Sequence, residues 1–218
     1  AEQTDLCIGA GRDLSGEAKA LVTECRTLLT GWIRDHEEFL TSLEPLIMPA
    51  DAPALIASMY RAAHAAGVGP MAAVAGAVAQ MVGEGLRVYS PDVIVENGGD
   101  IYLAGDRDRI IGIYAGESPL SNKLGVKITA DQLPLGICTS SGTVGHSLSF
   151  GKADAVMVLS PDAALADAAA TAAANRVRTP RDIQHALDFL SGIPGITGAV
   201  AVAGDKMGAW GAIELCRL

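Results

Sequence analysis

The sequence predicts an α+β fold in which mixed, largely antiparallel sheets pack in layers against helices. Two observations carry this prediction. Apolar residues recur at helical spacing over residues 17–33 and 54–66, whereas residues 92–114 form short β-rich runs joined by hairpin-like turns. Helices and strands then alternate in blocks, which favours α+β over a doubly wound sheet. Half of the 218 residues are hydrophobic, so we expect residues 1–218 to form a single large domain.

The first third of the chain is predicted to be mainly helical. Residues 5–12 are typical of a first strand, and a long helix begins near Glu17. A second helix covers residues 54–66. A third begins at Gly69-Pro70 and is rich in glycine and alanine, so another element must approach it closely.

The remaining elements are predicted from strand-like runs and two helix patterns. Ser160-Pro161-Asp162 is a well-formed helix start, with a cap, a proline and an acid. The last residues are interpreted as two strands around Gly204 to Met207 that close a sheet. In chain order we expect a meander of antiparallel strands over 92–95, 100–103 and 109–114, strands over 135–139 and 155–159, and helices over 163–174 and 181–190.

Charge and hydropathy argue against a nucleic-acid partner and a membrane span. Sixteen basic residues stand against 25 acidic ones, a formal net charge of −9, and the basic residues are scattered. The longest apolar stretch, residues 70–82, is shorter than the ~20 residues that a span needs. Residues 1–5 are polar and acidic, so we expect no secretory signal and a cytoplasmic location. Four separated cysteines are interpreted as buried thiols: Cys7, Cys25, Cys138 and Cys216.

Familiar catalytic motifs do not match the sequence. Gly9-Ala10-Gly11 begins like a dinucleotide fingerprint, but Leu14 stands where the third glycine is required. The sequence contains no P-loop, no GxSxG and no HExxH motif. Metalloprotease and hydrolase interpretations therefore lack support.

The first candidate site is the segment from Glu96 to Asp100. Gly98 and Gly99 allow positive φ angles and leave room for a ligand against main-chain N–H groups, while Asn97 and Asp100 add polar side chains. The same residues are typical of an ordinary hairpin turn. From the residues alone, the segment is either a structural turn or part of a binding site.

The second candidate is the polar loop that begins with Thr139, Ser140, Ser141 and Gly142 and continues through His146. Hydroxyls and glycine N–H groups in such a loop can hold a phosphate without a lysine. A serine–histidine pair, Ser140 or Ser141 with His146, is an alternative that would suit a phosphatase or an acyl-transfer enzyme.

The third candidate is a pair of polar residues in the alanine-rich helix. Asp167 and Thr171 are four residues apart and therefore share one helix face. Such groups are costly to bury unless they are paired, and hard oxygen ligands suit Mg²⁺. In the alternative interpretation, Asp167 satisfies a nearby backbone group or an arginine, and Thr171 bonds to its own helix.

The order of these motifs resembles that of the ApbE family, the FAD:protein FMN transferases. A glycine- and alanine-rich helix, a GGD turn, a TSSG loop and the segment SPxxxxADAxAT follow one another between residues 69 and 175. The stretch LGICTSSGTVGHSLSFGKADAV is most similar to the UPF0280 branch of ApbE-like proteins. The resemblance implies an ApbE-like, T-fold-like architecture.

The resemblance also implies Mg²⁺-dependent chemistry with FAD or FMN. In the transferases, the residues that match Asp167 and Thr171 help to hold Mg²⁺ at the FAD pyrophosphate, while FMN passes to a hydroxyl of a target protein. The turn of Gly98, Gly99 and Asp100 and the loop over residues 139–142 would border the nucleotide. His146 would lie near the reacting phosphate, and FAD pyrophosphate cleavage is a second reaction open to such a site.

The sequence departs from the transferase pattern at three places. Glu96 stands where the transferases have asparagine, and the glycine- and alanine-rich helix lacks their lysine. Their His-x-x-Asp-Pro segment keeps only His146, because Ser149 and Phe150 replace the acid and the proline. Without that carboxylate, the acceptor hydroxyl loses its expected base.

These departures keep a second interpretation open. The chain would then be a non-catalytic accessory protein that binds a small anionic ligand or a partner. The resemblance links this branch loosely to sulfide and homocysteine metabolism in anaerobes. The oligomeric state stays open.

Overall fold

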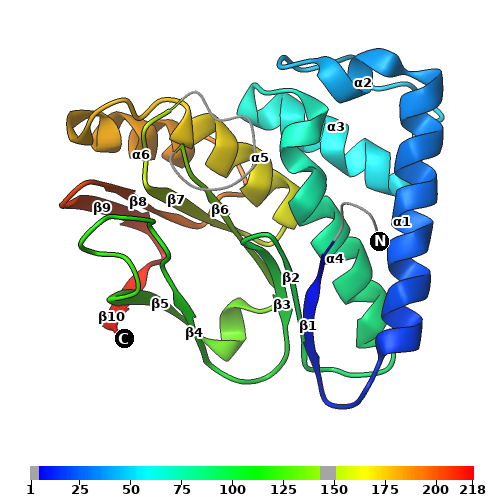
Figure 1. The fold of residues 1–218 in the computed structure, drawn as a ribbon, viewed down its shortest axis with the longest axis horizontal. Coiled ribbons are helices and arrows are strands. Elements are labelled where there is room, and N and C mark those ends of the chain that lie inside the picture. The colour runs from blue at the N-terminus through cyan, green and yellow to red at the C-terminus, as the bar shows by residue number, and fades with distance from the viewer. Residues whose placement is uncertain (1–4, 143–150) are drawn as a thin grey trace.

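Helices and two antiparallel sheets form three layers in the computed structural model, which describes residues 5–142 and 151–218 (Figure 1). A seven-stranded sheet is the middle layer, with the helices on one side of it and a three-stranded sheet on the other. Every strand pair in the described residues is antiparallel. The prediction of an α+β fold with largely antiparallel sheets is confirmed.

The large sheet has the spatial order β1-β2-β3-β6-β7-β8-β9, and the small sheet the order β10-β5-β4. Their bounds are β1 (Cys7–Ala10), β2 (Val93–Asn97), β3 (Asp100–Ala104), β4 (Arg109–Gly112), β5 (Leu124–Ile128), β6 (Leu135–Ser140), β7 (Ala155–Ser160), β8 (Gly198–Ala203), β9 (Lys206–Gly211) and β10 (Glu214–Arg217). The α-helices are α1 (Ser15–Asp35), α2 (Glu37–Thr41), α3 (Ala54–Ala66), α4 (Val74–Arg87), α5 (Ala163–Ala174) and α6 (Ile183–Ser191). Within residues 5–142 and 151–218, the short 3-10 helices are η1 (Pro70–Ala73), η2 (Ala130–Gln132) and η3 (Pro180–Asp182).

Two hydrophobic cores lie on opposite faces of the large sheet. Strands β7 and β8 are buried along their whole length, and their side chains alternate between the two cores. Met157 packs towards the small sheet, whereas its neighbour Val158 packs towards the helices. Burial on both faces explains why these strands are apolar throughout and lack polar alternation.

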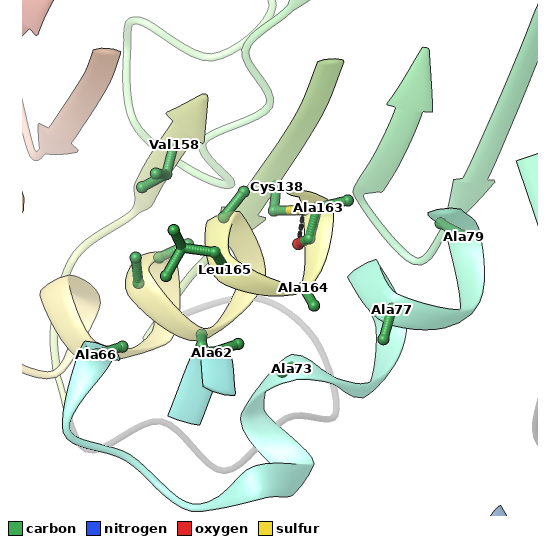
Figure 2. Close-up of a cluster of buried hydrophobic side chains, with 14 of the residues drawn as sticks. Ala62, Ala66, Ala73, Ala77, Ala79, Cys138, Val158, Ala163, Ala164 and Leu165 are labelled. Atoms are coloured by element: carbon green, nitrogen blue, oxygen red, sulfur yellow. Dashed lines mark hydrogen bonds between the residues drawn. The ribbon is translucent and has the colours of Figure 1, made fainter. Parts of the chain in front are cut away.

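Helix α5 is the centre of the helical layer. Figure 2 shows it beside Ala62 and Ala66 of α3 and Ala77 of α4, with Cys138 of β6 on the sheet side. Every residue of α5 except Thr171 is buried. Alanine combines the highest helix propensity with a short side chain, so α5 can be enclosed on all sides without losing its regular geometry.

The predicted close approach to the glycine- and alanine-rich helix is confirmed at two positions. A Cβ atom at Gly76 would lie 2.2 Å from the carbonyl oxygen of Ala163, and one at Gly83 would lie 2.1 Å from the Tyr102 ring. Helix α4 therefore packs directly against α5 at one end and against β3 further along. Packing, rather than a ligand, accounts for these two glycines.

Two strand predictions are wrong. The run over residues 109–114 does not continue the meander, because β4 pairs with β5 in the small sheet, and β5 itself is not predicted from its short LGVKI sequence. The chain end forms three strands rather than two. Gly211, with a φ of 80°, ends β9, and β10 then pairs with β5 in the other sheet.

The interpretation of the cysteines as buried is confirmed for Cys25 and Cys138 and wrong for Cys7, which is exposed on the edge strand β1. Cys216 is partly exposed. Burial raises the pKa of Cys25 to about 11 and the pKa of Cys138 well above its usual range. These two thiols are therefore neutral packing groups.

No single helix in the described residues is both long and apolar enough to cross a membrane. Helix α3 together with the stretch Pro70–Arg87 meets that test of length and composition, as a pair bent by 105°.

Candidate functional site

A pocket of about 700 Å³ lies where the β2–β3 turn, the end of β6 and helix α5 meet strand β4 of the small sheet. Pockets of this size hold nucleotides and other cofactors. Its lining is Ala75, Glu96, Asn97, Gly98, Gly99, Asp100, Ile101, Ile110, Ile111, Gly112, Tyr114, Thr139, Ser140, Ser141, Met157, Asp167 and Thr171. The pocket therefore brings together segments of all three sequence-predicted candidates.

The β2–β3 turn is a two-residue hairpin that also lines the pocket. Asn97 pairs with Asp100 across it, and Gly98 and Gly99 adopt φ angles of 64° and 103°. Side chains would strain such angles, so both glycines are required. The amide of Asn97 donates to the carbonyl of Ala75, 3.1 Å away, and ties the turn to α4. The hairpin interpretation is confirmed, and the turn borders a pocket as well.

Asp100 is the first residue of β3 and is 92% buried at the pocket, with 8% of its surface exposed. Its Oδ1 accepts a hydrogen bond from the backbone N–H of Thr139 at 3.2 Å. Burial, with a smaller contribution from the negative charge of Glu96, raises the pKa of Asp100 to about 7.

Asp167 on α5 joins that helix to the start of α4. Its Oδ2 accepts the backbone N–H of Gly76 at 2.9 Å, in the first turn of α4, where free N–H groups favour a carboxylate. Burial raises the pKa of Asp167 well above its usual range, and the charge of Asp100 adds to this effect. The alternative interpretation is thus confirmed for Asp167, which satisfies a backbone group and lines the pocket at the same time, while its expectation that Thr171 bonds to its own helix stays a prediction.

Of the other predicted site residues, some line the pocket and Gly142 does not. Thr171 lies one helical turn from Asp167, is the partly exposed residue of α5 and lines the pocket. Ser140 and Ser141 line it from the end of β6. Gly142 does not. Its N–H donates to the carbonyl of Ala153 at 2.8 Å, and a Cβ atom there would lie 2.1 Å from the carbonyl oxygen of Gly151.

His146 lies outside the described residues, so its predicted position near a reacting phosphate stays a prediction. Among residues 5–142 and 151–218, no group of three or more His, Cys, Asp or Glu side chains is arranged to hold a metal ion.

The sequence does not predict the apolar wall of the pocket. Ile110 and Tyr114, each 56% exposed, line it together with Ile111 and Met157. In the structure Ile111, Ile113 and Ala115 pack towards the core while Ile110 and Tyr114 are exposed, but the run from Ile110 to Ala115 is apolar throughout and its sequence shows no such alternation. Only the pairing of β4 with β5 places this run across from the β2–β3 turn.

A model of the protein family described as AbpE bacteria matches residues 1–204. The UPF0280 protein of Methanocella arvoryzae is 48% identical over 184 residues, which cover 84% of this chain and 75% of that protein. The chain belongs to the UPF0280 family of ApbE-like proteins. UPF0280 proteins of Methanococcus aeolicus and Methanocaldococcus jannaschii are both 42% identical to it, over 90% of this chain and 81% and 82% of theirs.

Two solved structures share the fold of this UPF0280 chain. The flavinyl transferase ApbE of Pseudomonas stutzeri, in its apo form, has a TM-score of 0.53 at 13% identity and covers 95% of this chain and 94% of its own. The flavin transferase ApbE of Vibrio cholerae has a TM-score of 0.55 at 12% identity, with coverage of 95% and 97%. The expected ApbE-like architecture is confirmed. At this identity the likeness concerns the fold alone.

Proposed function

We propose that this UPF0280 protein binds FAD together with Mg²⁺ in the pocket of about 700 Å³. The observation that carries the proposal is the two-sided lining of that pocket. Glu96, Asp100 and Asp167 form a polar, acidic side, whereas Ile110 and Tyr114 belong to an apolar side. A flavin dinucleotide has a flat, largely apolar ring system that suits the apolar side, and an anionic pyrophosphate that the acidic side can bind through a divalent cation. The ApbE structures that share the fold are named flavin transferases, which agrees with this ligand class.

The residues present fit a Mg²⁺ ion. The charge of Asp100 raises the pKa of the buried Asp167, and a divalent cation beside these carboxylates would relieve that repulsion. Mg²⁺ is usually bound by one or two carboxylates, with waters and substrate phosphates as its other ligands. This coordination preference agrees with the site, because the described residues supply no cluster of three acidic, histidine or cysteine side chains. Asp167 and Thr171 would hold the ion, with Asp100 next to them.

A cation is needed because the described lining contains no lysine or arginine. Residues 143–150 contain neither of these residues. A pyrophosphate that entered without a counter-ion would face Glu96, Asp100 and Asp167 with no compensating positive charge. Bound Mg²⁺ supplies that charge. The hydroxyls of Thr139, Ser140 and Ser141 and the N–H groups of the Gly98-Gly99 turn would border the phosphates.

The apolar side suits the isoalloxazine ring. Tyr114 and Ile110 both line the pocket and are each 56% exposed, so burying them against a flat ring would remove apolar surface from water. The ligand would then span the pocket from the small sheet to α5.

We expect FAD to bind at least tenfold more tightly with Mg²⁺ than in EDTA, about 1.4 kcal/mol. Quenching of flavin fluorescence during titration measures both affinities. Riboflavin, which lacks the phosphates, is the matched control and should bind weakly and equally in both buffers. Equal FAD affinity in the two buffers, or no binding in either, would refute the proposal.

The same incubation separates turnover from binding. Transfer of FMN to an acceptor hydroxyl and hydrolysis of the FAD pyrophosphate both release AMP, which chromatography detects. AMP that appears only with Mg²⁺ would show an enzyme. Mg²⁺-dependent binding without AMP, both alone and with an added protein that offers acceptor serine or threonine hydroxyls, would favour an accessory protein that holds the nucleotide.

A further inference from the structure

Glu96 is the outermost acidic residue of the pocket. It lies on β2, opposite Ile101 of β3, and the next residue pair along the hairpin is Asn97 with Asp100. Its side chain is exposed, whereas Asp100 and Asp167 are each only 8% exposed. Among the described residues, Glu96 has no ion-pair partner within salt-bridge distance. Its charge is therefore uncompensated at the pocket mouth.

Three carboxylates line the pocket: the exposed Glu96 and the buried Asp100 and Asp167. They do not converge on one point, because the described residues contain no such cluster able to hold a metal. Glu96 thus acts on the pocket through its charge and not as a third ligand.

An unpaired negative charge at the mouth has opposite effects on the two expected ligands. It lowers the energy of an approaching cation and raises that of an approaching pyrophosphate. Because Glu96 is exposed, both effects must weaken as salt is added.

We propose that Glu96 makes nucleotide binding conditional on the cation: its carboxylate repels the free flavin nucleotide from the pocket and attracts the divalent ion that must precede it. This inference rests on the proposed function. It assigns Glu96 a role in selecting the cation–nucleotide complex over the free nucleotide.

The substitution Glu96→Gln tests the inference through two affinities that should move in opposite directions. At low salt, removing the charge of Glu96 should weaken the binding of Mn²⁺ alone about threefold and tighten the binding of FAD in EDTA about threefold. Calorimetry measures the first and flavin fluorescence the second. Both changes in affinity should become smaller in 0.5 M NaCl, where the Debye length falls to about 4 Å from about 10 Å at 0.1 M.

Two control variants separate the charge at the pocket mouth from the shape of the side chain and from the net charge of the protein. Glu96→Asp keeps the charge and should behave like the wild type. Glu37→Gln removes an equal charge from an exposed position on α2, which lies away from the pocket (Figure 1). Two affinities that both fall or both rise would mean that Glu96 has only a structural role, and unchanged affinities would also overturn the inference. If the wild type binds FAD with Mg²⁺ while Glu96→Gln gives either of these two results, the inference falls and the proposed function survives. If the wild type binds no FAD at all, the proposed function and this inference both fall.

Discussion

Replacing Asp167 with asparagine is expected to abolish the Mg²⁺ dependence of FAD binding. Asparagine keeps an oxygen that can accept the N–H of Gly76, now 2.9 Å from the carboxylate, but it removes the charge that would hold the cation. Loss of even an indirect metal contact costs 10- to 100-fold in affinity, so we expect a loss of about 100-fold for Mn²⁺. FAD affinity in Mg²⁺ should fall to the value measured in EDTA.

The fold should tolerate this change. Asp167 is buried and its charged form is disfavoured there, so the neutral amide should leave the free energy of unfolding at pH 7 unchanged or higher. Asp162→Asn is the matched control, because Asp162 caps the same helix through Leu165 and does not line this pocket. A variant at Asp167 that is as stable as the wild type and still binds FAD in a Mg²⁺-dependent manner would show that the carboxylate does not hold the cation.

Replacing Gly76 with alanine is expected to destabilise the protein by about 3 kcal/mol, the upper part of the range for overpacking a core. The new Cβ would lie 2.2 Å from the carbonyl oxygen of Ala163 and 2.9 Å from the Cβ of Asp167. The carbonyl belongs to the start of α5 and cannot rotate away, so α4 and α5 must separate. Separation would also lengthen the hydrogen bond to Asp167 and weaken FAD binding.

Gly31→Ala is the matched control for this substitution. Gly31 lies inside α1 and has no heavy atom within 4 Å of an added Cβ, so alanine there should raise the free energy of unfolding by about 0.5–1 kcal/mol. Urea unfolding followed by circular dichroism compares the two variants. Equal effects at Gly76 and Gly31 would contradict the close packing of α4 on α5.

Local patterns predict the helices and the polar half of the site. The four-residue spacing of Asp167 and Thr171 places both on one face of α5, and the two glycines of the β2–β3 turn need positive φ angles whatever surrounds them. Each of these features depends on a few neighbouring residues. The sequence therefore shows them directly.

The apolar half of the site depends on long-range pairing. Ile110 and Tyr114 reach the pocket only because β4 leaves the meander and pairs with β5, which also receives β10 from the chain end. The contact between Asp167 and Gly76 likewise joins residues 91 positions apart. No local pattern encodes such pairings, so the pocket emerges only when the sheets and helices are assembled.

The central claim is that Asp167 holds a divalent cation against the pyrophosphate of a flavin nucleotide. Diffraction from crystals grown with FAD and Mn²⁺, recorded near the manganese absorption edge, tests it most directly. We expect an anomalous peak about 2.1–2.2 Å from a carboxylate oxygen of Asp167, close to the Mg²⁺ distance, with the flavin ring against Tyr114. FAD bound outside this pocket, or a manganese peak away from Asp167 while FAD fills the pocket, would contradict the claim.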